Sequence, residues 1–203
     1  GSGGYKEAHL KDTIEAIREK EFGEASKMLG MKKIYYLGYD EYTLVMNNEN
    51  VEYIVKILRE IDPEMIIIPN RDDYHETHIE TNRIATKAIR TAMKERKLEL
   101  GNPINPLIVL EWEHSIPKEP DVVVDITDEW DFKEQLMLCY GSQIGGREWQ
   151  KTKGLNEYRG ASIGIAYAEG FKTNRFLPLR LDALLKIANK AKSEKEEVYE
   201  TKN

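Results

Sequence analysis

Several features that would place a protein in a familiar class are missing from this 203-residue chain. Its single cysteine, Cys139, excludes an internal disulfide, and no apolar run reaches the length of about 18 residues that a membrane span requires. The chain also opens without the charged and apolar segments of a secretory leader. These absences predict a soluble protein in a reducing cytoplasm, with no membrane partner.

The charge pattern lacks a clustered basic run. Lys and Arg total 30 against 36 Asp and Glu, the two signs are interspersed, and the net charge is −6. A protein that neutralises many phosphates needs basic residues gathered together, so nucleic acid is not an expected partner and a small polar ligand fits better. Neither G-x-G-x-x-G nor G-x-x-x-x-G-K-[ST] follows an apolar run, which argues against the alternative of a nucleotide-binding α/β domain.

Apolar spacing predicts one α/β domain covering residues 1–203. Helices are predicted over residues 6–30, 50–61, 77–98, 130–140 and from 181, with a charged tail from about residue 186. Strands are predicted over residues 34–37, 65–68, 107–112 and 122–125, with a loop-rich stretch between 141 and 180. The alternation of short apolar strands with helices predicts a three-layer Rossmann-like sheet, its strands parallel and covered by helices on both faces.

Two of the four histidines follow the apolar run at residues 65–68, in the sequence His75-Glu76-Thr77-His78. Ligands gather beyond the carboxyl ends of parallel strands, and imidazole both binds Zn²⁺ and titrates near neutral pH. The pair is therefore a candidate metal or acid–base site. In the structural alternative, Thr77 and Glu80 form a capping box and the histidines are polar neighbours. Catalytic zinc needs three protein ligands, so the pair alone does not complete a site.

The other histidines and the cysteine are weaker candidates. His9 lies in a polar stretch and is expected to be solvated, and His114 follows a strand, where an ordinary loop role competes with a site role. Cys139 lies among Leu136, Met137 and Leu138, which predicts a small buried hydrophobe instead of an activated thiol.

Several motifs occur in an order that resembles the LmbE-like (PIG-L) N-acetylglucosaminyl deacetylase family. They cover roughly residues 14 to 172 and comprise Arg18-Glu19-Lys20-Glu21, Leu29-Gly30, Lys33 to Leu44, Arg59 to Pro69, His75 to His78, Tyr140 to Gln143 and Tyr158 to Phe171. The resemblance implies zinc-dependent hydrolysis of the N-acetyl group of an N-acetylglucosamine-type sugar. It also implies Zn²⁺ as cofactor, a small N-acetylated sugar as substrate and assembly as a homo-oligomer.

The resemblance further implies roles for individual residues. His78 is expected to be a zinc ligand in its neutral form, and His75 to stabilise the oxyanion or protonate the amine. Arg18 and Asp40 or Glu41 are expected to contact sugar hydroxyls, with a solvated helix arginine as the alternative for Arg18. Glu169, in the closing motif, is expected to have a structural role.

The chain departs from the family pattern in two places. Glu76 and Thr77 stand where the family has Pro and Asp, so the carboxylate that orients an imidazole is expected to be displaced or absent. The His-Pro-Asp-Asp-Glu motif, which supplies two further ligands and the base, is not in the sequence. An N-terminal βαβ unit is therefore expected to be missing, and these residues alone are not expected to be a competent enzyme. The alternative is a non-catalytic member of the fold that binds a sugar or a protein.

Overall fold

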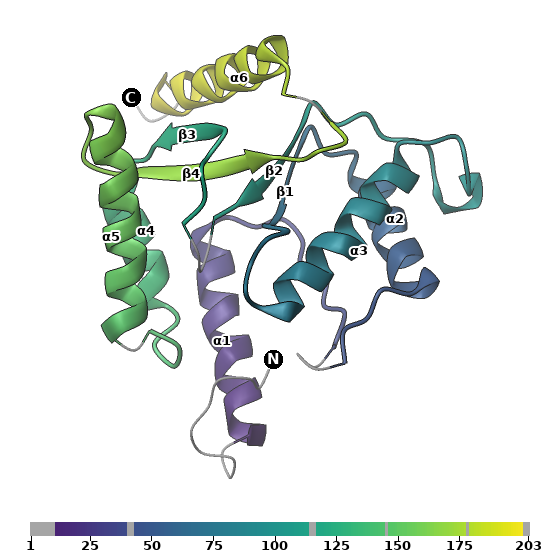
Figure 1. The fold of residues 1–203 in the computed structure, drawn as a ribbon, viewed down its shortest axis with the longest axis horizontal. Coiled ribbons are helices and arrows are strands. Elements are labelled where there is room, and N and C mark those ends of the chain that lie inside the picture. The colour runs from purple at the N-terminus through teal and green to yellow at the C-terminus, as the bar shows by residue number, and fades with distance from the viewer. Residues whose placement is uncertain (1–10, 40–42, 114–116, 145, 178, 201–203) are drawn as a thin grey trace. The chain divides into compact units, whose positions relative to one another are not determined.

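The computed structural model describes residues 11–39, 43–113, 117–144, 146–177 and 179–200 (Figure 1). They form the helices α1 (Lys11–Met28), α2 (Asn48–Ile61), α3 (Glu76–Ala92), α4 (Trp130–Leu138), α5 (Gly146–Ile163) and α6 (Leu181–Glu200), and a 3₁₀ turn, η2 (Leu98–Leu100). The strands are β1 (Met65–Pro69), β2 (Ile108–Trp112), β3 (Val122–Asp125) and β4 (Ala168–Thr173), ordered β1-β2-β4-β3. The predicted α/β class is confirmed. None of the helices in these ranges combines the length and the apolar character that a membrane crossing requires.

The chain divides into two compact units. Unit 1 comprises Gly1–Val45 and Val123–Gly170, and unit 2 comprises Met46–Val122 and Phe171–Asn203. Helices α1, α4 and α5 belong to unit 1, whereas unit 2 holds α2, α3, α6 and the strands β1 and β2. Strands β3 and β4 pass from one unit into the other.

The sheet is mixed, which corrects the prediction that all of its strands are parallel. β1 pairs in parallel with β2, with Ile67 opposite Leu110, but β4 pairs antiparallel to β2, with Lys172 opposite Glu111. Ile67, on the edge strand β1, is 50% exposed. Strand β4 lies in the stretch that was expected to be a loop. Its sequence, AEGFKT, is poor in β-branched residues, so pairing with β2 and not intrinsic propensity makes it a strand.

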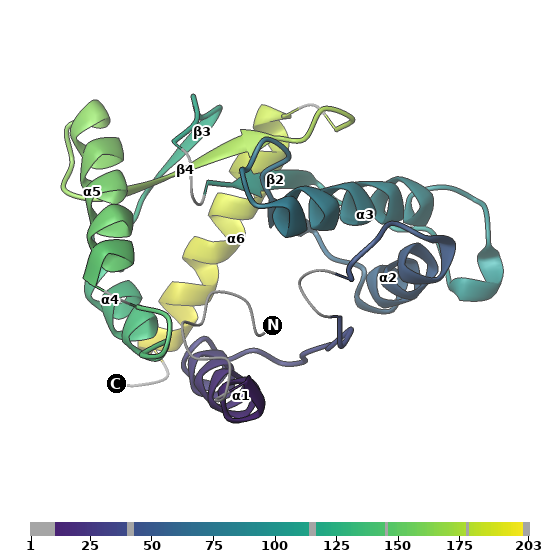
Figure 2. The ribbon, with the colours of Figure 1, turned by 60° about the horizontal axis from the view of Figure 1, so that its bottom comes forward.

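In unit 2, α2 and α3 lie side by side (Figure 2). The side chain of Arg59, near the end of α2, is buried and donates hydrogen bonds to six carbonyl oxygens between Thr91 and Gly101. These carbonyls belong to the end of α3 and to the turn that follows it. Because a helix end needs partners for its last carbonyls, this contact explains why α3 ends at Ala92 instead of continuing to Leu98 as predicted.

Two predictions for unit 1 are also corrected. Residues 34–37 were expected to form a strand, but they pair with no strand among the described ranges and instead contribute to a pocket. Helix α5 fills part of the stretch expected to be a loop. Within α5, Gly160 lies so close to the segment at Ala166 and Tyr167 that an added Cβ would be 2.6 Å from the carbonyl carbon of Ala166. This close approach requires glycine at that point.

Candidate active site

The segment after β1 brings the two predicted histidines together at the start of α3. His75 is the N-cap residue, and the backbone N–H of His78 donates to its carbonyl at 3.0 Å. The ring centroids of His75 and His78 are 5.0 Å apart. The capping-box alternative is wrong, because the N-cap is His75 and not Thr77. The carboxylate of Glu80 instead accepts from the N–H of Met46 and pairs with Arg83.

A carboxylate lies beside the second histidine. Asp73 Oδ2 is 3.1 Å from His78 Nδ1, and Asp73 Oδ1 accepts from the backbone N–H of His75 at 3.0 Å. Burial opposes ionisation of Asp73, but the hydrogen bonds from His75 and His78 outweigh it and lower the pKa of this carboxyl below 3.8. Since an ionised carboxylate only accepts, His78 Nδ1 must carry the hydrogen. In the neutral ring, the lone pair that a metal requires is then on Nε2.

Asp73 is the residue that the sequence analysis missed. The carboxylate expected inside the His-x-x-His motif is displaced to a position two residues before it. The available signal was the run Asp72-Asp73 shortly after the apolar run at residues 65–68, but sequence spacing does not distinguish which of these two carboxylates faces the ring. In the structure Asp73 is buried, whereas Asp72 is exposed.

A buried network fixes the segment that carries these side chains. Glu111, in β2, is fully buried and lies 2.6 Å from Arg71 Nη2, and it also accepts from Arg71 Nε at 2.8 Å. Asn174 Nδ2 donates to the same carboxylate at 2.9 Å, and Arg71 Nη2 donates to the carbonyl of Thr173. The network ties the residues after β1 to β2 and to the end of β4. It therefore holds the backbone next to Asp73 in place.

Aromatic rings surround the histidine pair. Tyr74 lies 4.3 Å from His75, and Trp112 lies 5.9 Å from His78, measured between ring centroids. Within the described ranges, no group of three or more His, Cys, Asp or Glu side chains is arranged to hold a metal ion. The pair with Asp73 therefore provides one oriented imidazole, able to offer its Nε2 to a metal ion, and a neighbouring imidazole.

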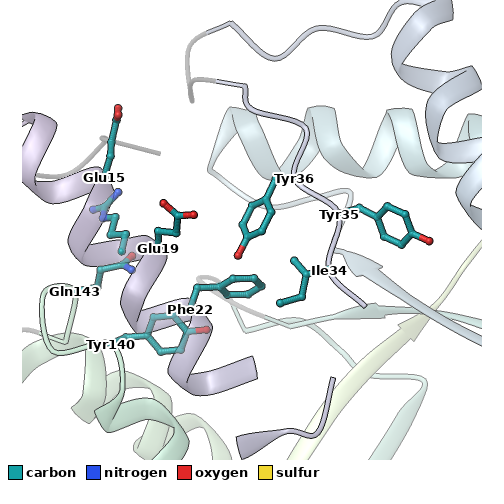
Figure 3. A pocket seen from close by; sticks show the side chains of 9 residues that line it. Glu15, Glu19, Phe22, Ile34, Tyr35, Tyr36, Tyr140 and Gln143 are labelled. Atoms are coloured by element: carbon teal, nitrogen blue, oxygen red, sulfur yellow. The ribbon is translucent and has the colours of Figure 1, made fainter. Parts of the chain in front are cut away.

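Unit 1 contains a separate pocket of about 570 Å³ that includes Arg18 (Figure 3). Its lining comes from α1, from the segment at residues 34–36 and from the turn after α4: Glu15, Arg18, Glu19, Phe22, Ile34, Tyr35, Tyr36, Tyr140 and Gln143. Phe22 meets Tyr36 edge to face at 5.9 Å. Burial, helped by the neighbouring Cys139 and Glu21, raises the pKa of Tyr140. Its hydroxyl therefore stays protonated and able to donate near neutral pH.

Two sequence motifs meet beside this pocket. Glu21, from α1, accepts hydrogen bonds from the backbone N–H and from the hydroxyl of Ser142, each at 2.6 Å. Ser142 lies between the pocket residues Tyr140 and Gln143. The contact therefore holds the turn after α4 against α1.

The remaining predicted residues divide into two groups. Asp40, Glu41, His9 and His114 lie outside the described residues. Glu169 forms an ion pair with Lys133, whose ammonium group also donates to Asn156. This network within unit 1 is consistent with the structural role expected for Glu169.

Comparison with known proteins confirms the predicted resemblance to the LmbE-like (PIG-L) family. The family model "PIG-L: GlcNAc-PI de-N-acetylase" matches residues 1–89. The probable N-acetyl-alpha-D-glucosaminyl L-malate deacetylase 2 of Bacillus cereus is 27% identical over 137 residues, which are 66% of this chain and 60% of the relative. The chain thus spans about three fifths of the length of that curated relative.

Two solved structures have a similar fold. The N,N'-diacetylchitobiose deacetylase from Pyrococcus horikoshii, in complex with an inhibitor, is 28% identical with a TM-score of 0.74, over 86% of this chain and 69% of that one. A conserved protein from Thermus thermophilus is 26% identical with a TM-score of 0.74, over 88% of this chain and 79% of that one.

Proposed function

We propose that the protein containing this chain is a zinc-dependent deacetylase that hydrolyses the N-acetyl group of an N-acetylglucosamine-type sugar or glycoconjugate. The observation that carries the proposal is the contact of 3.1 Å between Asp73 Oδ2 and His78 Nδ1. The match of residues 1–89 to the PIG-L family and the deacetylase names of two similar proteins support it.

The chemistry of these side chains fits one ligand of a zinc ion. A metal-binding histidine commonly donates its other ring N–H to a carboxylate, which fixes the ring and makes it a better ligand. Asp73 and His78 have that relationship, so His78 would hold the ion through Nε2. Zn²⁺, when bound, supplies a Lewis acid that polarises the amide carbonyl and makes water more acidic.

The residues of the chain would assist the hydrolysis by orientation and proton transfer. Water adds to the acetyl carbonyl, the C–N bond breaks, and acetate and the free amine leave. We assign to His75 a hydrogen bond to the oxyanion or the transfer of a proton to the departing nitrogen. The indole of Trp112, beside His78, would exclude bulk water from one side of the site.

The pocket in unit 1, considered by itself, is proposed to bind a sugar ring. Phe22, Tyr36 and Tyr140 offer ring faces and edges, against which the apolar face of a pyranose packs. Arg18, with Glu15 and Glu19, offers charged groups for hydroxyls. Asp40 and Glu41 are proposed as further contacts to sugar hydroxyls.

Release of acetate tests the proposal. The protein that contains this chain, loaded with zinc, is incubated with N-acetylglucosamine and with its glycosides, and acetate and free amine are measured together. We expect equal amounts of both products, and a loss of at least 100-fold in kcat/KM for His78→Ala. A zinc-loaded protein that binds these sugars but releases no acetate would instead support the non-catalytic alternative.

A further inference from the structure

Helix α3 and the turn after it carry four cationic side chains on one face, away from the histidine pair at the start of the helix. Arg83, Lys87 and Arg90, followed by Lys94 in the turn after the helix, are separated by four, three and four residues. This spacing places them in one stripe along the helix. Like charges at such spacing destabilise a helix, so the stripe costs stability. The basic residues appear interspersed in the sequence, and only the helical winding gathers them.

Carboxylates do little to neutralise this stripe. Arg83 Nη1 lies 3.4 Å from Glu80 Oε2, and the guanidinium of Arg90 lies 6.0 Å from the ring centroid of Phe176. Among the described residues, Lys87, Arg90 and Lys94 form no ion pair. The dipole of α3 favours cations near its carboxyl end, which accounts for Arg90 and Lys94, but it does not account for Arg83 and Lys87 in the middle of the helix.

The stripe borders a pocket of about 570 Å³, which distinguishes it from an ordinary solvated helix face. The four cations, Met46, Asn82, Thr86 and Thr91 line it. Asn82 is 5% exposed, and its amide donates to the carbonyl of Pro69 at 2.7 Å. Thr86 Oγ1 lies 3.4 Å from both Asn82 Oδ1 and Asn174 Nδ2. The floor of the pocket is thus polar and held by hydrogen bonds, whereas the cations at its rim are exposed.

We propose that this pocket, defined by Arg83, Lys87, Arg90 and Lys94, binds a small molecule with two or more linked phosphate groups. From Arg83 to Arg90 the stripe extends about 10 Å along the helix axis, at about 1.5 Å per residue, and Lys94 continues it beyond the end of the helix. A single phosphate contacts only part of that length, whereas an oligophosphate contacts cations along it. The guanidinium group of arginine and the ammonium group of lysine are well suited to binding phosphate oxygens. The proposal does not depend on deacetylation.

Calorimetric titration with inorganic tripolyphosphate at low ionic strength tests the proposal. We expect tripolyphosphate to bind at least tenfold more tightly than inorganic phosphate, and Lys87→Glu and Lys94→Glu each to weaken it at least tenfold. Lys56→Glu, on α2 in the same unit, makes the same charge change outside the pocket, and we expect less than a twofold effect. Thermal unfolding of each variant confirms that it is folded.

Three results would overturn the proposal. The first is the absence of any heat of binding when tripolyphosphate is added to the wild-type protein. The second is that Lys56→Glu and Lys87→Glu weaken tripolyphosphate binding equally, because that would show that only the net charge of the protein matters. The third is equal affinity for phosphate and tripolyphosphate. A parallel titration with adenosine triphosphate identifies the source of the phosphates. The same affinity as tripolyphosphate assigns recognition to the phosphate chain, and tighter binding assigns the site to a nucleotide.

Discussion

Asp73 Oδ2 and His78 Nδ1 lie 3.1 Å apart at the start of α3. The contact pairs a carboxylate with an imidazole, although no aspartate stands between the two histidines of the His-x-x-His motif. The carboxylate lies before the first histidine in the sequence, and its second oxygen accepts from the His75 N–H. One aspartate therefore fixes both the loop backbone and the orientation of the candidate zinc ligand.

The lowered pKa of Asp73 predicts a dependence of stability on pH. Its pKa in the folded protein lies below the ordinary value of 3.8, so its contribution is fully present above about pH 4 and is lost as the pH falls through the folded-state pKa. We expect the difference in free energy of unfolding between wild type and Asp73→Asn to shrink over that range. Urea unfolding at a series of pH values measures it. A constant difference would contradict the assignment, and Glu76→Gln, on an exposed neighbour, serves as the control.

Loss of the contact between Glu21 and Ser142 should loosen unit 1. Glu21→Gln removes the negative charge that accepts hydrogen bonds from the backbone N–H and the hydroxyl of Ser142. Hydrogen bonds to a charged group contribute about 1.5–3 kcal/mol each to the free energy of unfolding. We expect a loss of about 1–2 kcal/mol in the free energy of unfolding, measured in urea. Glu24→Gln, on the same helix, removes a carboxylate whose pairing with Lys20 is exposed, and should cost less than about 0.5 kcal/mol. Equal losses would refute the role of Ser142.

Arg59 should be among the most sensitive positions in unit 2. Its truncation to alanine removes hydrogen bonds to six carbonyl oxygens at and after the end of α3, of which four keep a backbone N–H donor. We expect Arg59→Ala to lower the free energy of unfolding by about 3 kcal/mol or more, and Arg59→Lys by less, because lysine keeps the charge without the planar fork. Lys56→Ala, an exposed position one turn earlier, should change it by less than about 0.5 kcal/mol. A small effect of Arg59→Ala would show that water replaces the guanidinium.

Two glycines of α5 should respond to alanine in opposite directions. A Cβ at Gly160 would lie 2.6 Å from backbone atoms of Ala166, whereas a Cβ at Gly154 meets nothing within 4 Å. We expect Gly160→Ala to destabilise the protein by about 1–3 kcal/mol through overpacking, and Gly154→Ala to stabilise it by up to about 1 kcal/mol through helix propensity. Melting temperatures of both variants measure this. Similar shifts in the same direction would argue against the close packing at Gly160.

The elements that the sequence predicted are those with strong local signals. The amphipathic spacing of α2 and the apolar run of β1 were sufficient to place both. β4 was missed because Gly170 and Lys172 weaken its strand signal, and its partner is β2, more than 50 residues earlier. The strand predicted at residues 34–37 is the opposite case, a strand that was predicted but is not formed. Apolar residues alone do not make a strand, because a strand also needs a neighbouring strand with which to pair.

At the candidate site, the sequence predicted the two histidines that lie together but not the side chains that hold their segment in place. The spacing of His75 and His78 after a strand was enough to identify the pair. Glu111 stands inside the apolar strand sequence IVLEW, where only the folded structure shows that Arg71 and Asn174 bind its carboxylate. Tertiary contacts of this kind have no spacing rule in sequence.

Zinc affinity of matched variants tests the central claim most directly. The metal-free protein that contains this chain is titrated with zinc against a fluorescent chelator, in wild-type, Asp73→Asn, Glu76→Gln and His78→Ala forms. We predict a weakening of about 10–100-fold for Asp73→Asn, a larger loss for His78→Ala and wild-type affinity for Glu76→Gln. Zinc bound equally well by wild type, Asp73→Asn and His78→Ala would contradict the account.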